Sequence, residues 1–486
     1  MYWKGKEMAG NGPDISIAFD LGNSGGKVYA ATMDSGRLEI LDELVISNEL
    51  VRIGDRLYWD LFRIFRDFKE AVKKCAKMGR VVSIAVDGTS GAFAFVNRAG
   101  TLGSYITTMR SMDSTLWKTE TEAKMSLQEL YDRTGVFPMG YNVLSRLTAE
   151  FASGELSRGI NAQFASITSL FEFLLTGQVR IERSMAGATV LMDPEFRDWN
   201  RPLLEILGIP TGILPEIVPP GTIGAPLLPK LAEELGCPDC RFIHTVEFDS
   251  AAAMVSAPGL TKEDIYLSMG STINPGVQLD HPVISDDARE YRYKNAPVWP
   301  GSVMLMSDVP GFFILQECLD LWKKTDPSLG HGELVELARA SKADAVMDLF
   351  DPRFSTTSHD MPGLIRAYCK ETGQNVPETV GDVARVLYLS YASAIAWSID
   401  KLKKITGKSD YRRIIAVSGG SRNALLNQMI ADASGMAVRA GDPKATCLGN
   451  LLVQFYALGK LDSYEAMQAE AERFCEMKDF APQRPL

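Results

Sequence analysis

Two stretches far apart in the chain share one outline of strand, glycine turn and strand: ISIAFDLGNSGGKVYAA (15–31) and DIYLSMGSTINPGVQL (264–279). Apolar and β-branched residues around a glycine turn favour a β-hairpin. A unit of this kind that recurs indicates two related halves, with a cleft between them. The 486-residue length agrees, because one hydrophobic core rarely extends beyond about 300 residues. We therefore predict two domains, residues 1–257 and 258–486.

The tip of the first hairpin carries groups that suit a phosphate. Its glycines let backbone N–H groups approach an anion. Asp20 could hold a magnesium ion through water, and Lys27 could neutralise phosphate oxygens. The spacing is not that of a Walker loop, and a turn without a ligand is the alternative reading. The cofactor-binding residues predicted here are Asp20, Gly22, Asn23 and Lys27.

Two later glycine turns offer similar groups. The second hairpin has Gly270, Ser271 and Thr272 at its tip, where hydroxyls and backbone N–H groups suit phosphate. Farther on, RRIIAVSGGSRNALLNQMIAD predicts a strand, a Gly419-Gly420 turn and a helix after Ser421. A helix N-terminus beside bare glycine backbone can accept parts of a nucleotide. We predict that this turn binds the nucleotide.

Asp249 is the predicted chemical centre. It follows Phe248 and precedes a run of serine and alanines (250–253), so its carboxylate leaves a loop where a helix of small side chains begins. Such a carboxylate can face a cleft. The alternative is that Asp249 caps the helix, which is a common role for aspartate at this place.

The remaining pattern indicates an α/β protein. Apolar residues at helical spacing predict helices at 60–78, 165–177, 308–324 and 382–407. The strand VVSIAVDG, which ends in Asp87 and Gly88, follows the first of them, and strand, helix and strand in succession suggest layers. The proline-rich stretch 214–227 is interpreted as a surface connection. Gly449, in a later helix, is expected to pack closely against the strand and turn near 412–420.

Composition limits the partners. The net charge of −10 argues against a general nucleic-acid or anionic-membrane surface, and no apolar run approaches the length of a membrane span. The beginning of the chain has no apolar segment of a secretory signal, so a cytoplasmic protein is expected. Seven scattered cysteines do not form a disulfide framework, and CPDC (237–240) is interpreted as a loop, not as a metal site.

Taken together, these motifs resemble the FGGY carbohydrate kinases. The resemblance covers nearly the whole chain in order: Asp20-Leu21-Gly22, Asp87, LTG (175–177), Asp249, Gly270-Ser271-Thr272, SGGSRNALLNQMIAD and ATCLGNLLVQ. NVLSRLTA, PPGTIG and DVPGFFILQECLDLW are most similar to the rhamnulokinase and fuculokinase kind. The family implies two actin-like, ribonuclease-H-like ATPase domains around a central cleft.

The resemblance also implies roles. Asp249 matches the catalytic base, and Asp20 and Asp249 match the groups near the metal. The three glycine turns match the ATP site, the last of them together with Ser421 and Asn423, with ATP and Mg²⁺ as cofactors. The substrate-binding residues that it suggests are Asp87, Gly88, Arg110, Asp113 and Phe248. The chain departs from the family at Gly25, where many members have a hydroxyl, at Ala92, where similar members have an acid, and at Lys444, which replaces an acid.

The expected function is transfer of the γ-phosphoryl of MgATP to a hydroxyl of a small ketose, a deoxyketose or a pentulose. The departure at Ala92 leads us to expect that L-rhamnulose is not the best acceptor. Two alternatives remain: an actin-like ATPase without a sugar substrate, and a sugar-binding regulator that has lost catalysis. A homodimer is considered, and the sequence does not define the sugar.

Overall fold

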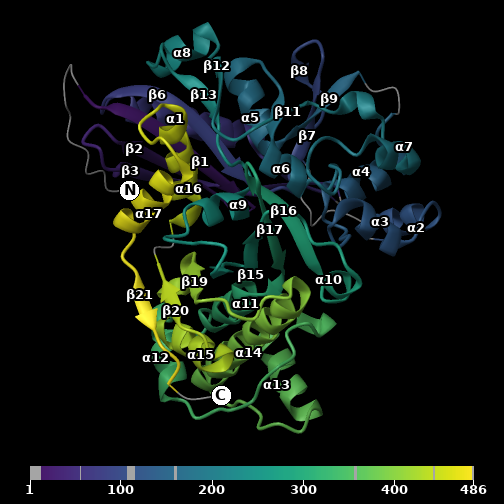
Figure 1. Ribbon diagram of the computed structural model, residues 1–486, viewed down its shortest axis with the longest axis vertical. Coiled ribbons are helices and arrows are strands. Elements are labelled where there is room, and N and C mark those ends of the chain that lie inside the picture. Colours follow the sequence, from purple (N-terminus) through teal and green to yellow (C-terminus); the bar gives the residue numbers. More distant parts are fainter. Residues whose placement is uncertain are drawn as a thin grey trace.

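The computed structural model describes residues 12–23, 25–54, 56–106, 115–157, 161–354, 358–441 and 444–483. Two mixed β-sheets, one formed before residue 245 and the other after residue 264, stand one above the other with helices on their faces (Figure 1). The α/β class predicted from the alternation of strands and helices is therefore confirmed. No helix in the described ranges is long and apolar enough to cross a membrane.

The first sheet has the strand order β12-β13-β6-β1-β2-β3. The predicted hairpin is its centre, because β1 and β2 pair antiparallel through Gly22 and Gly25. The neighbour of β1 on the other side, β6, is parallel to it, and β13 is parallel to β6. These strands comprise β1 (Asp14–Gly22), β2 (Gly25–Thr32), β3 (Glu39–Ser47), β6 (Arg80–Gly88), β12 (Thr222–Pro226) and β13 (Arg241–His244).

The second sheet repeats this plan. Its central hairpin pairs β14 antiparallel with β15, and β14 is flanked by the parallel strand β19, which is in turn parallel to β20. The repeated outline in the sequence is thus a repeated sheet topology. The strands are β14 (Ile265–Met269), β15 (Thr272–Leu279), β16 (Tyr293–Trp299), β17 (Ser302–Ser307), β18 (Val309–Pro310), β19 (Ile414–Val417), β20 (Val438–Ala440) and β21 (Lys478–Phe480).

Helices form three layers around the sheets. Helices α1 (Leu61–Cys75) and α5 (Ile167–Thr176) share a buried cluster with one face of the first sheet. Helices α9 (Asp249–Val255) and α16 (Ala445–Ala457) share another cluster with residues of both sheets, so they form the layer between them. Three helices cover the far face of the second sheet, namely α11 (Phe312–Trp322), α14 (Val380–Thr406) and α15 (Ala424–Ser434).

The remaining elements complete the fold, and the last of them shares the buried cluster of the middle layer. They are β4 (Leu50–Ile53), β5 (Arg56–Trp59), β7 (Phe93–Asn97), β8 (Thr101–Leu102), α2 (Leu116–Glu122), α3 (Leu127–Thr134), α4 (Val143–Ala152), β9 (Ala162–Ser166), β10 (Arg180–Glu182), α6 (Arg183–Ala188), α7 (Arg201–Leu207), β11 (Glu216–Val218), α8 (Pro229–Leu235), α10 (Asp286–Glu290), α12 (His331–Ala340), α13 (Met361–Glu371) and α17 (Tyr464–Phe474). All seven cysteines are buried and free, and CPDC is the turn between α8 and β13, as predicted.

Local sequence explains where the main helices start and stop. The side chain of Asp60 accepts from the backbone N–H of Arg63 at the start of α1. Gly177 and Gly407 end α5 and α14 in the left-handed conformation, as their positions after the apolar pattern predict. The helix expected from Asp308 begins only at Phe312, because Val309 and Pro310 pair with β15 as strand β18.

The stretch 214–227 is not a surface connection. It forms β11, which pairs with β10, and β12, which is the edge strand of the first sheet beside β13. The prolines stand at places where their missing N–H is tolerated: Pro226 is the last residue of an edge strand, and Pro219 and Pro220 lie in the turn between the two strands. The prolines and glycines of this stretch indicated only turns, so its two short strands were not predicted.

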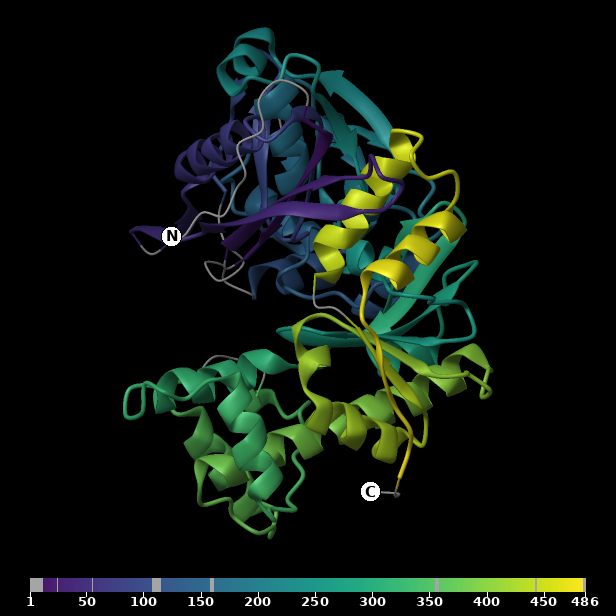
Figure 2. The ribbon, with the colours of Figure 1, turned by 90° about the vertical axis from the view of Figure 1, so that its left-hand side faces the viewer.

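The C-terminal helix α16 returns to the first sheet. Figure 2 shows α16 and α17 beside the strands of the N-terminal part, although they come from the end of the chain. The ideal Cβ position of Gly449 lies 1.9 Å from the carbonyl oxygen of Ala252 on α9, so only glycine fits there. The packing role expected for Gly449 is confirmed, but its partner is α9 and not the strand near 412–420.

Candidate active site

Three charged side chains stand in a row across the first sheet. Asp20 lies opposite Lys27 in the antiparallel pair and opposite Asp87 in the parallel pair. Residues that lie opposite each other on neighbouring strands point to the same face. This face is the one covered by α9 and α16. The hairpin tip therefore presents Asp20 and Lys27 toward the layer between the two sheets.

Asp20 sits in an unfavourable place for a negative charge. Burial and the nearby charge of Asp249 raise the pKa of Asp20 to about 7, against a smaller opposite effect of Lys27. Asp20 is still partly exposed, and Lys27 is exposed. A carboxylate that is crowded by a second carboxylate and still reaches the surface is a typical partner for a cation.

Asp87, at the end of β6, is buried beneath the site. It has no exposed surface, and its Oδ2 accepts a 2.6 Å hydrogen bond from Nδ2 of Asn450 on α16. Burial, and then the charge of Asp20, raise the pKa of Asp87 well above its usual value. This bond joins β6 to α16, while the buried Oδ1 of Asp87 has no hydrogen-bond partner among the described residues, and its predicted sugar contact stays a prediction. Gly88 is buried too, and a Cβ there would lie 2.5 Å from the carbonyl oxygen of Leu21.

Asp249 lies at the first position of α9. The cap position belongs to Phe248, and Oδ1 of Asp249 accepts from the backbone N–H and hydroxyl of Ser250, at 2.5 and 3.1 Å. Asp249 is therefore not the cap residue itself, although its carboxylate accepts from the N–H of Ser250 in the first turn of α9. Burial raises the pKa of Asp249, while the bonds from Ser250 and the positive charge of Lys294 act in the opposite direction.

A buried ionic network supports the segment before Asp249. His244 has no exposed surface and lies between two carboxylates, with Nδ1 2.7 Å from Oε1 of Glu247 and Nε2 3.1 Å from Oε1 of Glu172. Arg180 pairs with Glu172 through its guanidinium and also donates its backbone N–H to that carboxylate. Thr168 donates to the second oxygen of Glu247 at 2.5 Å. The polar groups are thus largely satisfied by one another.

The same network holds the backbone that leads to Asp249. The N–H of Glu247 donates to Glu182 at 3.1 Å, and the N–H of Phe248 donates to the hydroxyl of Ser184 at 3.1 Å. The carbonyl of Glu247 accepts from the N–H of Gly88 at 2.9 Å, so this segment is also fixed to β6. Phe248, expected to contact sugar, is only 9% exposed. We infer that these bonds position Asp249 at the end of a rigid segment.

The network predicts how stability changes with pH. Burial opposes a charge on His244, but the bonds to Glu172 and Glu247 outweigh it and raise the pKa of His244 from 6.5 to about 9. The folded protein therefore holds a proton that the unfolded chain releases between these values, so this stabilisation is complete below about pH 6.5 and is lost as the pH rises through 9. Glu182, whose pKa burial and Glu247 raise to about 8, acts in the same direction.

We expect urea unfolding to show this loss directly. The free energy of unfolding should fall by on the order of 2 kcal/mol between pH 6.5 and pH 9.5. The change should be smaller in His244→Gln, which cannot carry the charge. A free energy that is constant or rises over this range in the wild-type protein would contradict the charged state of His244.

The second hairpin tip is exposed and is held from behind. Ser271 and Thr272 are exposed, and the N-terminus of α11 donates to the tip through the N–H of Phe312, 3.2 Å from the carbonyl oxygen of Gly270. A Cβ at Gly311 would lie 2.8 Å from the carbonyl oxygen of Ser271, so the helix approaches the tip as closely as glycine allows. The groups predicted to bind phosphate therefore face outward, on a turn that α11 holds in place.

The turn after β19 has one glycine that can face a ligand. Gly419 is exposed, with no atom within 4 Å of its ideal Cβ position, whereas a Cβ at Gly420 would lie 2.5 Å from the ring of Phe312. Gly420 is therefore glycine because of packing. Ser421 and Asn423 use their side chains locally: the hydroxyl of Ser421 donates to the carbonyl oxygen of Gly441 at 2.6 Å, and Asn423 caps α15. These residues shape the turn.

Sequence reasoning missed a polar cluster near Asp249. The carboxylate of Asp308 pairs with Nζ of Lys294 at 2.7 Å and accepts from Asn274 at 2.6 Å and from Tyr141 at 3.2 Å. These four residues come from separate parts of the chain, and two of them, Asn274 and Lys294, lie on β15 and β16 of the second sheet. Lys294 also lies near enough to lower the pKa of Asp249. No spacing in the sequence connects them, and only the fold brings them together.

The structure shows the environment of the three residues that depart from the family pattern. Ala92 is 2% exposed and belongs to the core beside α5. Lys444 pairs with Glu43 on β3 at 3.1 Å, and Gly25 begins β2 with its ideal Cβ position 3.0 Å from the carbonyl oxygen of Ile46. Two other predicted substrate residues, Arg110 and Asp113, lie outside the described residues.

The site has features that suit a magnesium nucleotide. Asp20 and Asp249 are close enough for one charge to raise the pKa of the other carboxyl, and a divalent cation would offset that repulsion. Within the described part of the chain, no group of three or more metal-binding side chains is found. Magnesium commonly takes only one or two carboxylates, with phosphate oxygens and water completing its shell. Asn23 on the first hairpin tip and Ser271 and Thr272 on the second are exposed, as the predicted phosphate contacts require.

Models of known families match both halves of the chain. The N-terminal domain of the FGGY family of carbohydrate kinases matches residues 15–256, and the C-terminal domain of that family matches residues 265–458. Among curated relatives, the rhamnulokinase of Oceanobacillus iheyensis is 27% identical over 93% of this chain and 94% of that protein. The rhamnulokinase of Pectobacterium carotovorum is 29% identical over 93% of this chain and 90% of that protein.

Solved structures share the fold at low identity. Glycerol kinase from Plasmodium falciparum, solved with ADP, has a TM-score of 0.81 at 12% identity, covering 98% of this chain and 96% of that chain. Ligand-bound xylulose kinase from Lactobacillus acidophilus has a TM-score of 0.78 at 16% identity, covering 97% and 94%. These similarities extend over both sheets and the helical layer between them.

Two repeated sheets with exposed hairpin tips, and carboxylates in the layer between them, define a two-domain kinase of small molecules. Because both family models match and together span most of the chain, the class can be narrowed further. The protein belongs to the FGGY family of carbohydrate kinases, as the order of its motifs indicated.

Proposed function

We propose that this sugar kinase transfers the γ-phosphoryl of MgATP to a hydroxyl of a small ketose, with Asp249 as the general base. The observation that carries the proposal is the place of Asp249, at the start of α9 in the layer between the sheets and within electrostatic reach of both Asp20 and Lys294. A sugar hydroxyl is a weak nucleophile, so a carboxylate that accepts its proton is needed.

The surroundings of Asp249 suit this role. Burial raises its pKa, which makes the carboxylate more basic, while Ser250 and Lys294 counteract that rise and favour the ionised form that a base requires. The hydrogen bonds of Glu182 and Ser184 to the preceding backbone fix where the carboxylate stands. Positioning of this kind matters because a proton acceptor must lie within hydrogen-bond reach of the hydroxyl.

Asp20, Lys27 and the two hairpin tips form the phosphate side of the proposal. Magnesium, when bound, would neutralise charge on the transferred phosphoryl group, and Asp20 is the carboxylate that would hold it through water. Lys27 lies opposite Asp20, where it can balance phosphate charge. Backbone at Ser271 and Thr272 faces outward on the second tip, and the exposed Gly419 lets the nucleoside approach the turn after β19.

The polar cluster around Asp308 supports an acceptor with several hydroxyls. Lys294 and Asn274 donate to its carboxylate, and its partial exposure leaves capacity for further bonds. Curated relatives named rhamnulokinase favour a deoxyketose, and a solved relative is a xylulose kinase, so five- and six-carbon ketoses are the acceptors to test first. Because Ala92 is buried and supplies no acid, we still expect that L-rhamnulose is not the best of these acceptors.

We expect sugar-dependent formation of ADP. The purified protein with MgATP should release ADP only when an acceptor is added, and a panel of L-rhamnulose, L-fuculose, D-xylulose, D-ribulose and glycerol should rank by kcat/KM with a ketose first. EDTA should abolish the reaction. The sugar-kinase proposal fails if no member of the panel stimulates ADP formation by a protein that binds ATP.

The same assay decides between this proposal and its alternatives. An actin-like ATPase would release ADP without sugar, and a regulator without catalysis would bind sugar and ATP but release none. Only a kinase shows both requirements at once. The hydrogen-bonded setting of Asp249 and its nearness to Asp20 support catalysis over regulation.

Further proposals concern the setting of the enzyme. We propose that it works in the cytoplasm with ATP and Mg²⁺, and the considered homodimer stays a prediction. We also propose the division into residues 1–257 and 258–486, because each part contains one complete sheet. Helices α16 and α17 belong to the second part by sequence and pack with the first part in space.

A further inference from the structure

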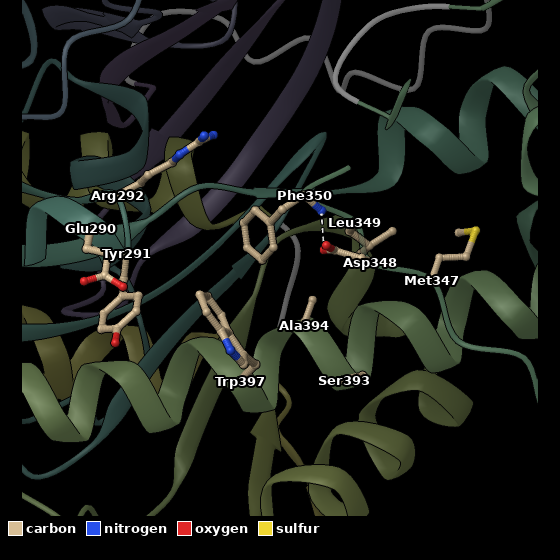
Figure 3. A pocket seen from close by; sticks show the side chains of 10 residues that line it. All are labelled: Glu290, Tyr291, Arg292, Met347, Asp348, Leu349, Phe350, Ser393, Ala394 and Trp397. Atoms are coloured by element: carbon tan, nitrogen blue, oxygen red, sulfur yellow. Dashed lines mark hydrogen bonds between the residues drawn. The ribbon is translucent and has the colours of Figure 1, made fainter. Parts of the chain in front are cut away.

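A pocket lies on the second domain, between the turn that joins α10 to β16 and the middle of α14. Its volume is about 440 Å³, which is within the range of small-molecule sites. Three aromatic rings line it, with the ring centre of Trp397 5.8 Å from that of Tyr291 and 5.4 Å from that of Phe350. Figure 3 shows Trp397 between the other two rings, on the helix below them. Trp397 is 40% exposed, so part of its ring is open to a ligand.

The rim of this pocket is polar and of mixed charge. Glu290 and Arg292 are exposed, and the guanidinium of Arg292 lies 5.5 Å from the ring centre of Phe137, which is outside the pocket lining. Asp348 accepts one bond, from the backbone N–H of Phe350 at 2.9 Å, which leaves lone pairs free. Acceptors and a donor therefore surround an aromatic floor.

The arrangement is built before any ligand arrives. Tyr291 is fixed by Lys401, whose Nζ lies 4.8 Å from its ring centre, and by Lys404, which donates to its hydroxyl at 3.4 Å. Lys401 also lies 5.4 Å from the ring centre of Trp397. The positive charge of Lys401 beside both rings disfavours a second cation there. Glu290 and Asp348 in turn disfavour an anion, so the pocket suits a neutral ligand.

The pocket is separate from the active site. None of its lining residues belongs to the hairpin tips, the carboxylates or the Asp308 cluster. The turn after β19, predicted to bind the nucleotide, contacts α14 through a hydrogen bond between the side chains of Asn423 and Tyr388. Tyr388 lies one to three helical turns before the pocket residues Ser393 and Trp397. Arg292 also stands in the left-handed region at a φ of 57°, a conformation that non-glycine residues rarely keep without a local reason.

We propose that this pocket is a second sugar-binding site, distinct from the site of phosphoryl transfer. A sugar presents an apolar carbon–hydrogen face and a ring of hydroxyls. The apolar face stacks on Trp397, and the hydroxyls bond Glu290, Asp348 and Arg292. Neutral charge, amphipathic faces and size all match a mono- or disaccharide.

Saturation-transfer NMR tests the site with aldoses that resemble the expected acceptors, namely L-rhamnose, L-fucose and D-xylose. At least one of these probes should bind the wild-type protein with a Kd below about 10 mM. Trp397→Ala should weaken that binding by about tenfold or more, and Glu290→Gln should weaken it less, because one acceptor is lost and the stacking surface is kept. Sugar-dependent ADP formation should stay within about twofold of wild type in both variants.

Two controls make the result decisive. Phe62→Ala removes an exposed aromatic ring from α1 in the first domain and should leave probe binding unchanged. Choline and inorganic phosphate test the charge argument, since neither should show a signal that depends on Trp397. The proposal is overturned if no aldose binds, if Trp397→Ala binds it as well as wild type does, or if only a charged probe depends on Trp397. Because the readout is binding, a failure of kinase activity would not imitate any of these outcomes.

Discussion

Asp249→Asn should lower kcat by at least about 100-fold while the fold and ATP binding persist. The change keeps the size of the side chain and its bond from Ser250 but removes the basicity that takes the proton of the sugar hydroxyl. Since the base acts in the transition state, kcat should fall far more than the affinity for ATP. Coupled-enzyme kinetics and calorimetric titration with ATP measure the two quantities on the same preparation.

A matched variant separates chemistry from general charge loss. Asp239→Asn makes the same substitution at an exposed surface aspartate in the CPDC turn, and it should leave kcat and stability near wild type. Turnover close to wild type in a folded Asp249→Asn protein would rule out Asp249 as the general base.

His244→Ala should destabilise the first domain by about 3 to 5 kcal/mol. Removing the imidazolium leaves the carboxylates of Glu172 and Glu247 facing each other in the core, each without one of its partners. The hydrogen bond and charge of His244 are also among the causes that, against the effect of burial, lower the pKa of Glu172. Urea unfolding followed by circular dichroism measures the loss.

Acid should partly rescue this variant. Protonation of either glutamate removes the repulsion, so the difference from wild type should shrink as the pH falls toward 5. His281→Ala, at an exposed histidine of the second domain, is the control and should change stability by less than about 0.5 kcal/mol. A loss for His244→Ala that equals the control, or that grows in acid, would show that the network is not ionic.

The sequence could predict what local chemistry decides. The first hairpin was predicted from Gly22 and Gly25, and helix ends were predicted at Asp60, Gly177 and Gly407. These predictions succeed because turns and caps depend on residues next to one another. The repeated outline also predicted the repeated topology. Motif order predicted the family, which the family models confirm.

What the sequence could not predict depends on contacts across long separations. His244 meets Glu172 over 72 positions, and Asn450 meets Asp87 over 363, so no window of sequence shows either pair. The partner of Gly449 was predicted wrongly for the same reason: a small residue indicates close packing but not against which element. The close approach of the Phe312 ring to Gly420 was likewise not visible in the sequence, and the nucleotide contact expected of Gly420 stays a prediction.

The return of α16 to the first sheet sets an order of events during synthesis. Nδ2 of Asn450 bonds the buried Asp87, and the side chain of Gln454 bonds Ser83 and the carbonyl oxygen of Ile17. These polar groups of the first sheet lack their partners until residues 445–457 have left the ribosome, more than 350 residues after β6. The first sheet therefore emerges first and is completed last, and a truncated chain that ends before Lys444 would leave one of its faces uncovered for chaperones to hold.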